Sequence, residues 1–148
     1  MHCLSAGPDG IAIIRGGPEL PCLRGQVRFY QQRCRVLVVA EIQGLPQDSE
    51  TGFFAMHIHG DGNCCGVGFP ETGSHFNPAG LPHPEHAGDL PPLMLCGDGA
   101  YLAVRTDRFR VEEVIGKTVV IHSRADDFQS QPAGNTGSKI ACGVIRRR

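Results

Sequence analysis

Short apolar segments alternate with clusters of glycine and proline along this chain, and the alternation limits the folds open to it. The clearest segment runs from Cys34 to Leu45, is rich in β-branched residues and ends at Pro46. Such a segment, bounded by turn residues, is typical of a β-strand. Further strands are expected over residues 10–17, 23–31, 53–59, 100–105, 118–123 and 140–145. Short strands in this number, separated by turn signals, favour an antiparallel sandwich or barrel.

Little of the chain is left for helix. One helical turn is expected from Val111 to Ile115, closed by Gly116, although the same residues also fit a loop. No repeat or linker divides the sequence, so residues 1–148 are expected to form one domain. A chain of about this length buries enough surface to form a core without crosslinks.

Charge and hydropathy argue against several partners. The 14 basic and 15 acidic residues give a net charge of −1, so nucleic-acid binding by bulk electrostatics is not expected. No apolar run approaches the roughly 18 residues of a membrane span, so no membrane partner is expected. Residues 1–10 lack the basic and apolar regions of a secretory signal. The sequence as it stands is therefore expected to be cytoplasmic, with a periplasmic or extracellular location as the alternative if it has been trimmed.

The interval from Gly60 to Leu95 is the longest one without a predicted strand. It contains seven glycines and six prolines. Loops of this length in compact domains are usually functional. Something other than regular secondary structure is therefore expected to order this loop.

Histidines gather in and around this interval. Six of the seven histidines lie between positions 57 and 122, and the remaining one, His2, is expected at the surface. His57 and His59 end a predicted strand, where alternation places both side chains on one face. Taken alone, such a pair is more often two surface histidines. His122 ends the predicted strand over 118–123 and can face the same point, although taken alone it fits a histidine at the edge of the core.

The long loop carries a second cluster, in which His83, His86 and Asp89 are spaced by two residues each. Two imidazoles and a carboxylate are a normal zinc set that lacks one donor, which His75 could supply. Taken alone, His83 and His86 are more often solvated loop histidines. A metal, however, would supply the order that a loop rich in glycine and proline lacks.

These residues belong to a longer series of motifs that resembles the copper/zinc superoxide dismutases. The series comprises His57-Ile58-His59, Gly73 to Pro78, His86 to Leu90, Ile115 to His122, and Ala141 to Ile145. The motifs follow the family's order, and the resemblance covers residues 10–145. The resemblance implies an all-β fold, an eight-stranded antiparallel Greek-key β-barrel or sandwich with two long functional loops.

The resemblance also implies a site and a reaction. It makes His57, His59, His75 and His122 copper ligands, and it makes His75, His83, His86 and Asp89 zinc ligands, with His75 shared. Asp126 would link His57 to His83 through hydrogen bonds; taken alone, it fits a turn aspartate. The implied reaction is dismutation of superoxide to oxygen and hydrogen peroxide by copper cycling between Cu(II) and Cu(I), with zinc as structural partner.

Three features depart from the family pattern. The stretch from Asp127 to Gly134 is short and has no charge from Phe128 to Ala133, where many relatives carry a longer charged loop, so weaker steering of the anion is expected. Only Pro84 and Glu85 separate His83 from His86, which is a shorter zinc loop than familiar eukaryotic members have. Lys139 stands where the family has an arginine beside the copper. Lysine keeps the positive charge but loses the planar pair of donors, so reduced activity is expected if Lys139 has a catalytic role. Taken alone, it fits a solvated lysine.

The family's disulfide joins a cysteine of the long loop to the residue that matches Cys142. Cys64 follows His59 by five residues, as in bacterial relatives, and is the favoured partner; the adjacent Cys65 is the alternative. Cys3, Cys22, Cys34 and Cys96 are expected to be free or buried thiols.

Two rival functions stay open beside dismutation. One is a non-enzymatic copper carrier or buffer on the same scaffold, suggested by Lys139 and the shortened loops. The other is a copper-only dismutase with a vestigial zinc loop. The sequence leaves the oligomeric state open, with a homodimer as one arrangement.

Overall fold

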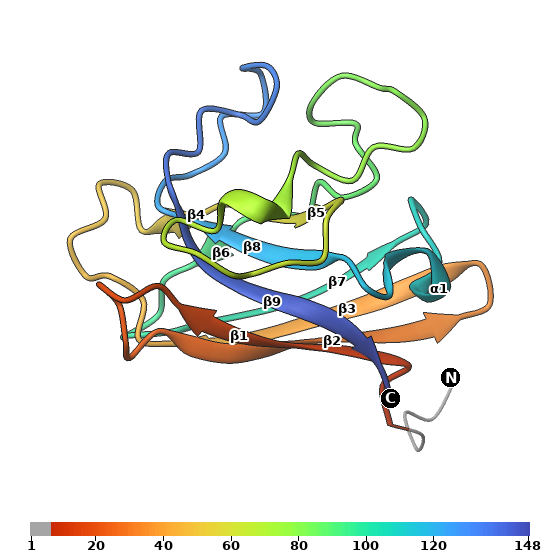
Figure 1. Cartoon of the computed structure of the whole chain (residues 1–148), viewed down its shortest axis with the longest axis horizontal. Helices are drawn as coiled ribbons and strands as arrows, with labels where there is room; N and C mark the ends of the chain where they lie inside the picture. Colours follow the sequence, from red (N-terminus) through yellow and green to blue (C-terminus); the bar gives the residue numbers. More distant parts are fainter. Residues whose placement is uncertain (1–6) are drawn as a thin grey trace.

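Strands make up nearly all of the regular structure in residues 7–148, which are the residues that this computed structural model describes (Figure 1). The strands are β1 (Gly10–Gly16), β2 (Arg24–Gln32), β3 (Arg35–Gln43), β4 (Phe53–Phe54), β5 (Met56–His59), β6 (Leu93–Met94), β7 (Ala100–Thr106), β8 (Thr118–His122) and β9 (Lys139–Arg147). Helix is limited to the 3-10 turn η1 (Pro70–Thr72) and the single turn α1 (Val111–Val114). Within the described residues no helix has the length and apolarity needed to cross a membrane. The expectations for His2 and Cys3 lie outside those residues.

The strands form one large antiparallel sheet and one small one. The seven-stranded sheet has the order β5-β8-β9-β1-β2-β3-β7, and β4 pairs with β6. β6 lies beside β7, and β4 is followed at once by β5, so the small sheet lies between the two edges of the large one. The connections from β3 to β5 and from β7 to β8 cross between these edges. This arrangement is the expected Greek-key barrel.

Alternation of side chains places the core inside the curled sheet. In β1, Ala12 and Ile14 are fully buried, whereas Ile13 between them is 50% exposed. In β3, Val36, Val38 and Ala40 are fully buried and belong to the same cluster. This period of two is what a sheet with one solvent-facing side requires.

The helical turn expected before Gly116 is present as α1. Val111 and Val114 are buried and anchor it on the core. Gly116 follows with a φ of 85°, a left-handed conformation that glycine adopts without strain. The loop alternative for these residues is therefore wrong.

Two details of the predicted strand pattern need correction. The segment 53–59 is not one strand: Phe53 and Phe54 pair with β6, and Ala55 bonds instead to Arg124 before β5 begins. The interval 60–95, predicted without strands, contains η1 and β6. Neither β4 nor β6 has a sequence signal of its own, because a two-residue strand exists only through its partner.

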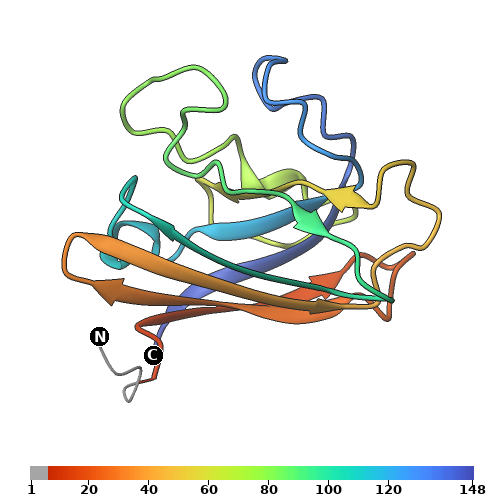
Figure 2. The ribbon, with the colours of Figure 1, turned by 180° about the vertical axis from the view of Figure 1, so that it is seen from behind.

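Two long loops rise on the same side of the sheet. The chain between β5 and β6 and the chain between β8 and β9 both extend above the short strands β4, β5 and β6 (Figures 1 and 2). Side chains far apart in the sequence can therefore meet between these loops and the sheet.

Candidate metal centre

β5 carries His57 and His59, the first two histidines of the candidate site. It pairs with β8, so that His57 lies opposite Val120 and Ile58 opposite Val119. Ile58 is fully buried in the apolar core. His57 and His59 must then point to the other side of the strand, as alternation predicts.

The long loop runs along the other edge of β5. Bridges pair His57 with Asp89 and His59 with His75. The main chain of Ile58 donates to Gly88 and accepts from Phe76, each at 2.8 Å. Backbone pairing with β5 therefore orders the loop near residues 75–76 and 88–89. This corrects the expectation that only something other than regular secondary structure orders this loop.

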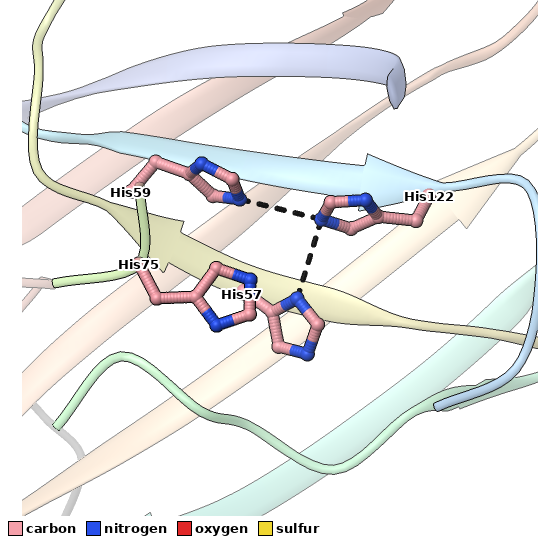
Figure 3. Close-up of side chains that lie close together, drawn as sticks. All are labelled: His57, His59, His75 and His122. Atoms are coloured by element: carbon pink, nitrogen blue, oxygen red, sulfur yellow. Dashed lines mark hydrogen bonds between the residues drawn. The ribbon is translucent and has the colours of Figure 1, made fainter. Parts of the chain in front are cut away.

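The first donor group consists of four buried histidines from three parts of the fold. His57 and His59 come from β5, His122 from the end of β8, and His75 from the loop (Figure 3). His122 Nε2 lies 3.2 Å from His57 Nδ1 and 3.3 Å from His59 Nε2. One donor atom from each residue lies within 4.8 Å of the others.

The second donor group consists of His75, His83, His86 and Asp89. His75 Nδ1 lies 3.2 Å from His86 Nδ1 and 2.8 Å from Asp89 Oδ1. His83 Nδ1 lies 3.0 Å from Asp89 Oδ2 but makes no hydrogen bond. His75 is thus common to both groups, and the sequence-predicted histidines between 57 and 122 are all brought together.

Hydrogen bonds on the outer sides of the rings set which nitrogen faces inward. Asp126 accepts from His57 Nε2 and His83 Nε2, each at 2.8 Å, and the carbonyl of Gly73 accepts from His59 Nδ1 at 2.8 Å. Because these oxygens only accept, the protons sit on the outer nitrogens. The inner nitrogens of the three rings therefore present lone pairs to the two clusters.

Gly134 allows the second long loop to approach this carboxylate. Its φ is 80°, and a Cβ there would collide with the Asp126 carboxylate and the His83 ring. A larger residue at this position would displace the loop from the cluster.

Burial keeps four of the clustered imidazoles neutral. It lowers the pKa of His59 to about 3 and the pKa of His122 to about 2, and neighbouring histidines add to both shifts. Burial also lowers the pKa of His57 and of His86. Burial would raise the pKa of Asp126, but hydrogen bonds from His57 and His83 hold it at about 2. At neutral pH these four histidines therefore offer neutral imidazoles, the form that binds metals, and Asp126 is an ionised carboxylate.

The disulfide joins Cys64 to Cys142, as expected, and Cys65 is exposed and unpaired. Cys22, Cys34 and Cys96 are exposed free thiols. The bond links the loop after β5 to β9 and so connects the long loop to the sheet.

Comparison with known proteins decides the family. The family model described as copper/zinc superoxide dismutase (SODC) matches residues 23–145. This chain belongs to the copper/zinc superoxide dismutase family.

Its relatives include both enzymes and a chaperone. Superoxide dismutase [Cu-Zn] 2 of Aquifex aeolicus is 35% identical, over 82% of this chain and 78% of the relative. The extracellular superoxide dismutase [Cu-Zn] of Rattus norvegicus is 31% identical over 86% of this chain and 57% of the relative. The copper chaperone for superoxide dismutase of Homo sapiens is 34% identical over 90% of this chain and 52% of the relative. Family membership alone therefore does not decide activity, and the predicted compartment and homodimer stay predictions.

The donor groups fit the family's metals, copper and zinc. Two nitrogens bound to one ion at about 2.0–2.1 Å and an angle near 100–110° lie about 3.1–3.4 Å apart, which matches the inward-facing pairs. His75 Nε2 and His83 Nδ1 are buried without a hydrogen-bond partner, as ligand atoms would be before binding. A group of four imidazoles suits Cu(II), and three imidazoles with one carboxylate suit zinc.

Lys139 lies beside the first donor group, on a cavity of about 390 Å³ that is also lined by His59, His75 and His122. Its ammonium donates to Thr72 Oγ1 at 2.7 Å and to the Phe69 carbonyl at 3.4 Å. Burial lowers its pKa. The lysine is therefore half-buried and anchored, not freely solvated.

Sequence reasoning missed two polar residues around the cluster. Thr136 places its hydroxyl 3.2 Å from His122 Nδ1, and Thr72 holds Lys139. Both threonines are buried, but neither belongs to a motif quoted for the family resemblance. Only their three-dimensional neighbours reveal them.

Proposed function

We propose that this chain dismutates superoxide to oxygen and hydrogen peroxide. His57, His59, His75 and His122 would hold copper, and His75, His83, His86 and Asp89 would hold zinc. The observation that carries the proposal is the shared position of His75. Its Nδ1 faces the second donor group, and its buried Nε2, without a protein partner, is left for the first.

When bound, copper supplies the change of oxidation state by which one superoxide is oxidised and a second is reduced. The remaining tasks fall to residues of this chain. His75 Nε2 is the inward-facing atom that could take up a proton when it is not a ligand, while Nδ1 keeps its place in the second group. Asp126 holds His57 and His83 in fixed orientation through one carboxylate, so the two groups keep their relative position.

Lys139 would draw the substrate into the cavity. Superoxide is a small anion, and a positive charge in a cleft raises the rate of encounter with it. The anchoring by Thr72 keeps that charge on the wall of the cavity lined by His59 and His122. Because lysine offers a point charge where the family has an arginine fork, docking would be less precise.

The test combines metal analysis with kinetics. Protein loaded with copper and zinc is expected to hold one of each per chain and to accelerate superoxide decay after pulse radiolysis. Decay no faster than in buffer, at full copper content, would overturn the proposal.

His75→Ala tests the shared ligand. Removing this side chain takes one donor from each group, so copper and zinc affinities are both expected to fall, by tenfold or more. Competition with chelators measures the two affinities separately. Retention of both metals at wild-type affinity would rule out the bridge.

A copper carrier is the second candidate. It is favoured by the similarity to the human copper chaperone and by Lys139 in place of arginine. A carrier would bind copper, transfer it to an apo-acceptor and leave superoxide decay unchanged. The copper-only alternative has less support, because the second donor group is complete around His75.

A further inference from the structure

Two side chains outside the donor groups make hydrogen bonds to the main chain of residues 83–86, here called the zinc loop. The first is Gln131, from the loop between β8 and β9. The N–H of His83 donates to Gln131 Oε1 at 3.0 Å, and Gln131 Nε2 donates to the carbonyl of His83 at 2.7 Å. The amide thus pairs with both main-chain groups of one residue, as a neighbouring strand would.

The second side chain is Arg108, from the segment between β7 and α1. Its Nη1 donates to the carbonyl of Pro84 at 2.8 Å and to the carbonyl of His86 at 3.2 Å. The N–H of Arg108 itself donates to Thr106 Oγ1 at 3.1 Å, which steadies the segment that carries it. Arg108 therefore approaches the short loop from the side of β7.

These contacts occur where the main chain of the zinc loop is not paired with a strand. His83 and His86 lie outside every helix and strand, separated only by Pro84 and Glu85. Asp126 fixes the ring of His83, whereas the hydrogen bonds to the His83 main chain come from Gln131. The position of the ring nitrogens therefore depends on what holds the backbone between these two histidines.

We propose that Gln131 and Arg108 are positioning residues of the zinc half-site, defined as His75, His83, His86 and Asp89. This inference rests on the proposed function, in which that half-site holds zinc. The two clamps hold the short loop in its binding conformation before the ion arrives, so that less of the binding free energy is spent on ordering it. Since Gln131 belongs to the second long loop, it also ties that loop to the first.

The charge of Arg108 and its proposed positioning role predict opposite changes in zinc affinity when the side chain is removed, so the experiment can tell them apart. A guanidinium near a cation site repels the ion, so its removal would raise zinc affinity if charge alone mattered. If Arg108 positions the loop, removal lowers the affinity. Arg108→Lys keeps a donor and the charge, and is expected to restore part of the loss.

The experiment measures zinc affinity of copper-free protein by competition with a chromophoric chelator. Partners of this kind commonly contribute 10–100-fold to metal affinity, so Gln131→Ala and Arg108→Ala are each expected to weaken zinc binding by about tenfold or more. Gln129→Ala and Arg105→Ala are the controls, because these side chains are exposed and make no hydrogen bond to the main chain of residues 83–86. Copper affinity is expected to stay at the wild-type value in all four variants.

Two spectroscopic readouts separate positioning from general destabilisation. In Gln131→Ala the d–d absorption of Co(II) bound at the zinc half-site is expected to change in intensity, because the tetrahedral donors are less well aligned. In the metal-free Gln131→Ala variant the His83 amide hydrogen is expected to exchange with solvent faster than in wild type. The amide hydrogen of Ile58 in β5, which is donated to the Gly88 carbonyl, is expected to keep its protection from exchange.

The outcomes distinguish this inference from the proposed function. Wild-type protein that binds no zinc would overturn both. Wild-type protein that binds zinc, together with Gln131→Ala and Arg108→Ala variants that bind it as tightly, would overturn the positioning roles alone. Higher zinc affinity in Arg108→Ala than in wild type would mean that Arg108 acts only through its charge and would overturn its positioning role.

Discussion

Lys139 shows how much a single residue depends on its neighbours in this molecule. Its side chain is anchored by the fully buried Thr72, which in turn donates to the Phe69 carbonyl at 3.0 Å. A flexible lysine is thereby given a defined place. Lysine lacks the planar pair of donors of an arginine, but these hydrogen bonds partly offset that loss because they hold the ammonium group in one position.

Substitution of Lys139 tests its role. Lys139→Glu is expected to lower the rate constant for superoxide decay by roughly 10- to 1,000-fold and to invert its dependence on ionic strength, because the field at the cavity changes sign. Lys139→Arg is expected to raise the rate constant. Pulse radiolysis at several salt concentrations, on proteins of equal copper content, measures both. A Lys139→Glu variant as fast as wild type at low salt would show that the charge has no part in catalysis.

At the level of elements, the link between the long loop and β9 has the largest expected energetic consequence. The Cys64–Cys142 bond closes a separation of 78 residues. Cys142 is buried beside Val120 of β8 and Phe69 of the loop. The bond therefore ties the loop that carries His75 to β9, a strand in the interior of the large sheet.

Cys142→Ser tests this link. On the chain-entropy model, closing a separation of this size stabilises the folded state by roughly 4–5 kcal/mol, although measured gains are often smaller. The variant is expected to melt below oxidised wild type and close to reduced wild type. Calorimetry of the three proteins, all metal-free, is the measurement. Equal melting temperatures would mean that the bond contributes nothing.

For the molecule as a whole, the buried histidines couple stability to pH. The pKa of His59 is lowered by burial to about 3 and that of His122 to about 2, whereas an unfolded histidine has a pKa near 6.5. Between these values the unfolded chain binds more protons than the folded one. Stability of the metal-free protein must therefore rise with pH across this window and fall on acidification.

Urea unfolding of metal-free protein at several pH values is the measurement. The midpoint is expected to be nearly constant above pH 7 and to fall steadily as the pH drops below about 6.5. Bound metals add stability at neutral pH because they bind only the folded site, and acid removes this gain by competing for the ligands. A midpoint for the metal-free protein that is flat from pH 7 to pH 4 would contradict the buried neutral histidines.

The sequence by itself determined the strand-forming segments and the candidate donor residues. The short apolar segment in residues 10–17 and the β-branched run from Cys34 to Leu45 predict strands because a local pattern suffices for them. His57 and His59 could be placed on one face for the same reason. The motif series then predicted the family, and with it the barrel.

Only the tertiary structure decided which partners meet across long separations. The choice of Cys64 over Cys65, the split of β4 from β5, and the contacts of Thr136, Gln131 and Arg108 all depend on segments that are distant in the chain. A hydrogen bond from the Gln131 amide to the main chain of His83, 48 residues away, leaves no periodic or compositional trace. These details follow from how the loops pack against the sheet, and packing is a property of the whole fold.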